Sequence, residues 1–135
     1  MITTNELLTA LLDDSRPIGD HYGLKTYEIN GDEYAIASDY DAAEQACSEY
    51  IKETVWAFKA DFLASHINAL NAGDIDRLRG DTYESCNDAL LKLIDDVDAF
   101  VNDAISADGL GHFLSPYDGY MVEIKETDVL LFRLN

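Results

Sequence analysis

The sequence predicts an α+β protein in which an antiparallel sheet combines a β-hairpin near the N-terminus with one at the C-terminus. Residues 24–29 and 34–38 are short β-prone runs, and so are residues 120–124 and 129–134. Apolar residues at helical spacing occupy the chain between them. Because a lone hairpin is only marginally stable, we expect the two to pair into one sheet, packed on one face by three to five helices. At 135 residues the chain has the size of one domain, so we predict a single globular domain over residues 1–135.

The N-terminal third begins with a predicted amphipathic helix. Residues 4–14 follow a Thr or Asn cap, and Pro17 ends the run. The apolar stripe consists of Leu7, Leu8, Leu11 and Leu12. Between the first two strands, Asn30 and Gly31 supply the positive φ angles that a tight hairpin turn requires.

A second helix is predicted from the apolar stripe that follows the first hairpin. Asp39 or Asp41 is positioned to cap this helix, and the stripe continues to Leu70. We expect a kink or a short interruption near residues 59–61. Residues 71–74, which contain Asn, Gly and Asp, are predicted to end the helical run.

A third helical pattern follows a short linker that holds Arg77 and Arg79. Asp81 and Glu84 resemble a capping box with Asp in the place of Ser or Thr. The three-and-four spacing of apolar residues then continues to residue 107. The pattern is compatible with one helix or with two helices broken at Asp95-Asp96.

Residues 109–119 are predicted to form a loop, and they contain the most enzyme-like group of side chains. His112 is close in sequence to two hydroxyl residues and a carboxylate that could take part in acid-base chemistry, namely Ser115, Tyr117 and Asp118. Residues so close in sequence rarely form a triad, and the nucleophile-elbow, phosphate-loop and dinucleotide motifs are absent from the sequence. We therefore predict that the protein is not an enzyme. We expect the loop to pack Phe113 and Tyr117 under the C-terminal hairpin, with His112 bonded to a backbone carbonyl.

Other candidate groups have simpler explanations. The two cysteines, Cys47 and Cys86, lack metal-ligand spacing and are expected to be buried and free. Asp and Glu pairs two residues apart, such as Asp39 and Asp41, lack the spacing of a calcium loop, so we predict no metal and no cofactor. His66 is expected to be a hydrogen-bonded core histidine.

The aromatic residues of the central stripe have two possible roles. Trp56, Phe58 and Phe62 are expected to belong to the core. The alternative is an exposed anchor for a binding partner.

The net charge restricts the partners more than any motif does. Twenty-seven acidic residues and nine basic residues give a formal charge of −18. Nucleic acids and anionic membranes both require clustered Lys and Arg, so we exclude direct binding to either. Basic proteins are the expected partners, and the sequence is also compatible with a homodimer. With no membrane-spanning run and no signal-peptide pattern, we expect a cytoplasmic location.

The acidic residues concentrate in two segments. Residues 81–108 hold eight acids and one base, and residues 28–53 also hold eight acids and one base. If residues 81–108 formed one helix about 42 Å long, it would carry one net charge per roughly 6 Å, against one per about 3.4 Å along a DNA strand. Two such faces side by side would approach duplex density. The candidate partner-binding residues are Glu44, Glu49, Asp81, Glu84, Asp88, Asp95, Asp98 and Asp103.

Two stretches carry a resemblance to a known group of proteins. They are residues 50–58, with the sequence YIKETVWAF, and residues 108–119, with the sequence DGLGHFLSPYDG, before a final strand that ends in FRLN. Over residues 34–135 the chain resembles small acidic proteins of unassigned function encoded by tailed bacteriophages. The resemblance implies no catalytic residues. It implies a context in which small acidic proteins bind host proteins, as antirestriction and anti-CRISPR proteins do, and a location in the host cytoplasm.

Two functional hypotheses follow from these observations. The first is an acidic inhibitor that occupies the basic nucleic-acid-binding site of a host or defence protein. The second is a non-catalytic adaptor or structural protein that uses a hydrophobic surface, with acids that serve only solubility. The second hypothesis requires Trp56, Phe58 or Tyr117 to be exposed.

Overall fold

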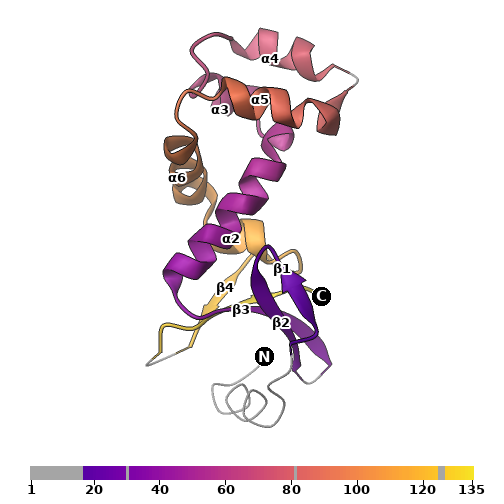
Figure 1. The fold of residues 1–135 in the computed structure, drawn as a ribbon, viewed down its shortest axis with the longest axis vertical. Coiled ribbons are helices and arrows are strands. Elements are labelled where there is room, and N and C mark those ends of the chain that lie inside the picture. Colours follow the sequence, from indigo (N-terminus) through magenta and orange to yellow (C-terminus); the bar gives the residue numbers. More distant parts are fainter. Residues whose placement is uncertain (1–16, 30, 81, 125–126) are drawn as a thin grey trace. The chain divides into compact units, whose positions relative to one another are not determined.

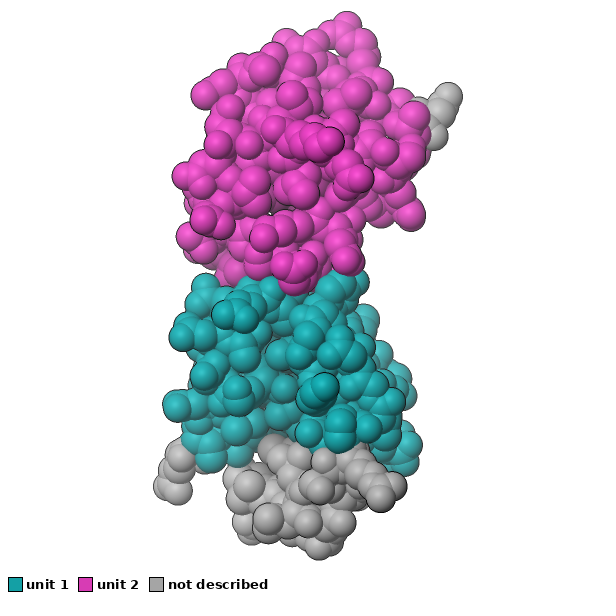
Figure 2. Space-filling model, viewed as in Figure 1, with its two compact units in different colours: residues 1–47, 108–135 teal, residues 48–107 magenta. Residues whose placement is uncertain are grey.

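The computed structural model describes residues 17–29, 31–80, 82–124 and 127–135 (Figure 1). The predicted helix at residues 4–14 and the predicted cap at Asp81 lie outside these residues. The chain is α+β, as predicted. Contacts between Cα atoms divide it into two compact units, which we describe separately (Figure 2). Unit 1 comprises residues 1–47 and 108–135, and unit 2 comprises residues 48–107.

Unit 1 contains the predicted antiparallel sheet. Its strands are β1 (Gly19–His21), β2 (Leu24–Ile29), β3 (Asp32–Ala37), β4 (Met121–Glu123) and β5 (Leu130–Arg133). Their order is β1-β2-β3-β5-β4, so the pairing of β3 with β5 joins the N-terminal and C-terminal hairpins. The additional edge strand β1 was not predicted, because three residues are too few to show an alternating pattern.

The turn between β2 and β3 has the predicted tight geometry. Ile29 pairs with Asp32, which leaves a two-residue connection. Gly31 has a φ of +86°, a conformation that costs glycine little and most other residues much more. Asn30, the other turn residue, lies outside the described part of the chain.

Helices α2 (Tyr40–Glu53) and α7 (Leu110–Leu114) lie against one face of this sheet (Figure 1). The ring nitrogen Nε2 of His21 lies 3.0 Å from the carbonyl oxygen of Leu114, which joins α7 to the edge strand β1. The sheet residues on this face are buried, and they include Leu24, Ala35, Leu130 and Phe132. The sequence predicted a loop where α7 lies, because its single turn is flanked by glycine and proline residues that are typical of loops.

Unit 2 is built from short helices. They are the 3-10 turn η1 (Val55–Ala57), α3 (Ala60–Ala64), α4 (Ala72–Arg79), the 3-10 turn η2 (Tyr83–Cys86), α5 (Asn87–Leu93) and α6 (Val97–Asp108), whose last residue belongs to unit 1. Residues 48–53, at the end of α2, also belong to unit 2. The predicted interruption is present, although it already begins after Glu53, where α2 ends. Leu63, Ile67, Ile75, Leu90 and Phe100 are among the fully buried side chains of this unit.

The prediction that residues 71–74 end a helix and lead into a linker was wrong. These residues begin α4 through a capping box, in which the Asn71 side chain accepts from the N–H of Asp74 and the Asp74 side chain accepts from the N–H of Asn71. Arg77 and Arg79 therefore lie in the last turn of a helix. Asn and Asp serve both in turns and at helix N-caps, so the residue types alone did not distinguish the two.

Of the two alternatives for residues 81–108, the broken helix is the one observed. Ile94 has an extended backbone and ends α5. The Asp96 carboxylate accepts a hydrogen bond from the N–H of Ala99 at the start of α6. A continuous acidic helix about 42 Å long is therefore absent from this part of the described chain.

Aromatic side chains form a cluster inside unit 2. Phe58, Phe62 and His66 surround the fully buried Phe100, with ring centroids 5.1–5.5 Å from that of Phe100. Phe58 and Phe62 are half-buried, as is Trp56, so these aromatic residues pack partly in the core. Both cysteines are buried and free, as predicted. No helix within the described residues combines the length and the apolar character that crossing a bilayer requires.

Candidate functional site

The arginines of unit 2 are engaged by groups of their own helix and its neighbours. Arg77 pairs with Asp74 at 2.6 Å, and Arg79 pairs with Asp76 at 2.8 Å. Arg79 also donates to the carbonyl oxygens of Trp56 and Phe58, and only 15% of its side chain is exposed. These arginines therefore neutralise carboxylates of α4, and they do not pair with the acids of α5 and α6.

Four of the eight candidate acids are exposed and have no cationic partner among the described residues. They lie in α2 (Glu49), η2 (Glu84), the first turn of α5 (Asp88) and the first turn of α6 (Asp98). None of them forms an ion pair with a Lys or Arg of the described residues. These carboxylates are available to a basic partner.

Two other candidates, Asp95 and Asp103, are exposed but bond to residues elsewhere in unit 2. The Asp95 carboxylate accepts a hydrogen bond of 2.8 Å from the N–H of Asn68, and its own N–H donates to the carbonyl of His66. The Asp103 carboxylate lies 2.8 Å from Nε2 of His66. The prediction that His66 is a satisfied, mostly buried histidine is confirmed. The contacts of Asp95 and Asp103 could not be predicted from the sequence, because both residues lie far along the chain from residues 66–68.

The remaining two candidates contribute less. Glu44 is half-buried on α2 in unit 1. Burial of the Cys47 thiol and, to a smaller extent, the charge of Glu44 raise the pKa of Cys47 to about 12. Asp81 lies outside the described residues. By sequence, unit 1 holds 15 acids and four bases, and unit 2 holds 12 acids and five bases. Each unit is thus strongly acidic on its own.

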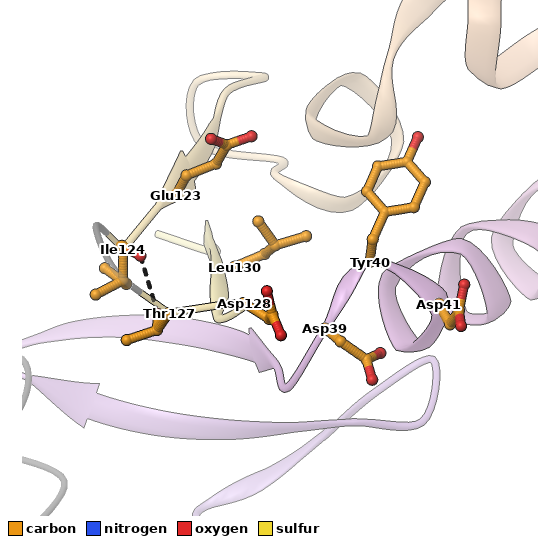
Figure 3. Close-up of a pocket in the computed structure, with 8 residues that line it drawn as sticks. All are labelled: Asp39, Tyr40, Asp41, Glu123, Ile124, Thr127, Asp128 and Leu130. Atoms are coloured by element: carbon orange, nitrogen blue, oxygen red, sulfur yellow. Dashed lines mark hydrogen bonds between the residues drawn. The ribbon is translucent and has the colours of Figure 1, made fainter.

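Unit 1 contains an acidic pocket that the sequence did not predict as a site (Figure 3). It has a volume of about 630 Å³ and is formed by the start of α2, the end of β4 and the approach to β5. Its lining residues are Asp39, Tyr40, Asp41, Glu123, Ile124, Thr127, Asp128 and Leu130. The sequence marks Asp39 and Asp41 as a possible helix cap and as a carboxylate pair, and the other two carboxylates, Glu123 and Asp128, come from the opposite end of the chain.

The pocket combines an apolar floor with an acidic rim. Ile124 and Leu130 are buried, whereas Tyr40 and the four carboxylates are exposed. Asp39 also caps α2, because its carboxylate accepts from the N–H of Ala42 at 2.8 Å. Within the described residues no three His, Cys, Asp or Glu side chains are placed to hold a metal ion. A long cationic side chain has the matching chemistry, because its alkyl stem is apolar and its end is charged.

The residues of the enzyme-like segment support the fold. The buried hydroxyl of Ser115 lies 2.9 Å from the Asp118 carboxylate and 2.8 Å from the carbonyl oxygen of Arg133, so it joins the turn after α7 to β5. The Arg133 guanidinium stacks on the Tyr117 ring at 3.7 Å. His112 is exposed, and its ring contacts that of Phe113. Phe113 is buried as expected, but Tyr117 is exposed, because it packs against Arg133 on the surface.

Comparisons with protein-family models, curated proteins and solved structures found no match.

Proposed function

We propose that this protein is an acidic inhibitor that occupies the basic nucleic-acid-binding site of another protein. The observation that carries the proposal is a group of three exposed carboxylates in unit 2, at Glu84, Asp88 and Asp98, that form no ion pair with a Lys or Arg of the described residues. They project from three successive elements, η2, α5 and α6. A host or defence protein is the proposed target, in keeping with the resemblance to small acidic phage proteins.

The electrostatic basis is the same as for nucleic-acid binding. The Lys and Arg residues of a cleft that holds DNA or RNA neutralise phosphates and displace the counterions bound to them, and exposed carboxylates offer the same residues an alternative set of negative charges. Because α5 and α6 are separate helices, these carboxylates do not lie along one continuous helix. Complementary charge also accelerates association with a basic partner.

The acidic pocket of unit 1 extends the proposal to a specific contact. One Lys or Arg side chain of the partner would lay its alkyl stem on Ile124 and Leu130 and place its charge among the surrounding carboxylates. Such an inserted side chain contributes more to affinity than charges at the exposed rim do. Glu123→Gln combined with Asp128→Asn should therefore weaken partner binding without changing the fold.

The test begins with capture of a partner from bacterial lysate at low salt, followed by affinity measurements between 0.05 and 0.2 M NaCl. We expect affinity to fall on the order of tenfold or more over this range, and nucleic acid to compete for the partner. The decisive variant is Glu84→Lys/Asp88→Lys/Asp98→Lys. It spares Asp95 and Asp103, whose contacts stabilise unit 2.

A matched control carries the same change of charge elsewhere. Glu28, Glu53 and Asp61 are also exposed and are not among the eight candidates, so Glu28→Lys/Glu53→Lys/Asp61→Lys should retain most of the affinity. Circular dichroism and urea unfolding establish that both variants fold. If the two variants lost affinity equally, the net charge alone would explain binding, and the named residues would form no specific site. Unchanged affinity in the first variant would reject the proposal.

A second function is favoured by one observation. Tyr117, Tyr120 and Val122 are 54%, 71% and 38% exposed, and they follow one another closely before and within β4. Exposed tyrosines are enriched at protein interfaces, as expected of an adaptor that binds through an apolar surface. Such binding would change little with salt, and Tyr120→Ala would weaken it more than the triple charge reversal.

A further inference from the structure

Tyr83 combines a strained backbone with an exposed side chain. It begins η2 with a φ of +39°, and the residue is 59% exposed. A positive φ is uncommon outside glycine, and a bulky residue that adopts it carries conformational strain. The other non-glycine residue with a positive φ in the described chain is Tyr22, which lies with Gly23 in the two-residue turn between β1 and β2, where positive φ angles are normal. Tyr83 lies between two helices, so no hairpin turn accounts for its strain.

The side chain of Tyr83 has no partner within the described residues. Its ring stacks on no cation and on no aromatic side chain there, and its hydroxyl forms no hydrogen bond. Its backbone is held, because the carbonyl oxygen of Tyr83 accepts a hydrogen bond of 2.8 Å from the thiol of Cys86, which is buried. The start of η2 is thus fixed to the interior of unit 2, whereas the Tyr83 ring is available to a partner.

Two of the exposed carboxylates of unit 2 lie close to Tyr83 along the chain. Glu84 follows Tyr83 directly, and Asp88 lies about one helical turn after Glu84, because residues 86 and 87 keep a helical backbone between η2 and α5. Neither carboxylate forms an ion pair with a Lys or Arg of the described residues. A cation that approaches η2 therefore meets both an aromatic ring and negative charge.

Of the two long cationic side chains, arginine fits this combination better. An aromatic face attracts cations through its negative quadrupole, and a planar guanidinium can stack on the ring while its N–H groups donate to carboxylates. The ammonium group of lysine is compact and strongly hydrated, and it has no flat surface to stack. The chain itself contains this kind of contact: the Arg133 guanidinium lies 3.7 Å from the centre of the Tyr117 ring and pairs with Asp32 at 3.0 Å.

We propose that Tyr83 and Glu84 bind an arginine side chain of the partner, with Asp88 as an additional negative charge. The inference rests on the proposed function, in which a basic nucleic-acid-binding site meets these acids, and it names arginine as the residue that contacts η2. Tyrosine and arginine are both enriched among the few interface residues that dominate binding energy. The Tyr83 ring is thus the central contact of this surface, and the carboxylates beside it steer the partner.

Hexa-arginine and hexa-lysine peptides test the site on the unaltered full chain without a partner. In an NMR titration we expect hexa-arginine to shift the Tyr83 ring resonances more than hexa-lysine does. The affinity read from the amide resonances of Glu84 and Asp88 should also be higher for hexa-arginine. Movement of these amides without movement of the Tyr83 ring, or equal affinity for the two peptides, would overturn the proposal.

Two variants of Tyr83 separate the role of the ring from that of the backbone. Tyr83→Asn should weaken hexa-arginine binding by about two- to fivefold, the effect of one exposed cation–π contact. It should keep the turn, because asparagine tolerates a positive φ. Tyr83→Phe retains the ring and should bind like the unaltered protein, as should Tyr120→Asn, which removes an exposed tyrosine of unit 1. Equal affinity of Tyr83→Asn and Tyr83→Phe would show that the ring is not the contact.

A captured partner separates this inference from the proposed function. Its affinity should fall by a similar factor with Tyr83→Asn and stay unchanged with Tyr83→Phe. If Tyr83→Asn had no effect while Glu84→Lys/Asp88→Lys/Asp98→Lys abolished binding, the arginine contact would be wrong and the inhibitor function would stand. If the triple charge reversal left the affinity unchanged while hexa-arginine still shifted the Tyr83 ring, the inhibitor function would be rejected and the arginine site retained.

Discussion

Gly111 occupies a position in α7 where a side chain has no room. A Cβ atom built there would lie 2.7 Å from backbone atoms of Gly119, Tyr120 and Met121. Backbone atoms cannot rotate away as a side chain does, so α7 approaches the start of β4 only because residue 111 is glycine. This contact helps to hold the segment after α7 against the sheet.

Gly111→Ala should therefore lower the free energy of unfolding by about 1–3 kcal/mol, as overpacked sites usually do. Gly73→Ala is the control, because its Cβ would approach only one side-chain atom, the Oδ1 of Asn71 at 3.3 Å, on an exposed helix. We expect the control to stay within about 1 kcal/mol of the unaltered protein. Urea unfolding measures both, and equal values would contradict the steric explanation.

A second single-residue feature is the side chain of Thr26 in β2. Its hydroxyl is buried and has no hydrogen-bond partner among the described residues. Thr26→Val keeps the shape and removes the unsatisfied oxygen, so we expect the free energy of unfolding to rise by about 1 kcal/mol.

Thr54→Val serves as the opposite case for this measurement. The Thr54 hydroxyl donates to the carbonyl of Tyr50 at 2.8 Å, so its removal should destabilise the protein by about 1 kcal/mol. Thermal or urea unfolding measures the free energy of unfolding of both variants. A larger loss of stability in Thr26→Val than in Thr54→Val would contradict the explanation.

At the scale of single elements, the start of α4 is stabilised by a capping box whose strength depends on pH. The N–H of Asn71 and then the Arg77 guanidinium hold the pKa of Asp74 below its ordinary value of 3.8. A carboxyl group with a lowered pKa stabilises the folded state above its unfolded pKa, and this contribution is lost as the pH falls through the folded value. The capping box should therefore weaken in acid, below about pH 4.

Asn71→Ala should lower the free energy of unfolding at pH 7 by about 1 kcal/mol, since the N-cap loses its side-chain acceptor. Asn71→Ala keeps the backbone N–H that donates to the Asp74 carboxylate, so it should retain the acid sensitivity that Asp74 contributes. Asp74→Asn should remove that acid sensitivity, whereas Asn102→Ala, at an exposed position inside α6, should change neither property. Urea unfolding at pH 7 and pH 3.5 measures both effects. An unchanged pH dependence in Asp74→Asn would show that the Asp74 carboxylate does not set it.

At the scale of the whole molecule, the net charge of −18 dominates. Like charges repel one another in the compact state, and salt screens that repulsion. Raising NaCl from 0.05 to 0.5 M should therefore increase stability against urea. KCl must act alike, because screening depends on ionic strength and not on the cation, and a flat or opposite response would contradict the explanation.

Both hairpins and the α+β class followed from the sequence alone. Asn30-Gly31 and the alternating strands are local signals, so β2 and β3 could be predicted from a few neighbouring residues. The short elements β1 and α7 and the start of α4 could not, because turn residues and single helical turns share the same composition.

The strong acidity was evident from the sequence alone, as were the acids that the partner hypothesis names. The contacts of those acids came only from the folded chain: the carboxylates of Asp95 and Asp103 bond to Asn68 and His66, whereas those of Glu84, Asp88 and Asp98 form no ion pair with a Lys or Arg of the described residues. The folded chain also brings Asp39 together with Asp128 in one pocket. The net charge is a sum over residues, so it can be calculated without knowing the fold. The partner of each carboxylate depends on contacts between distant parts of the chain.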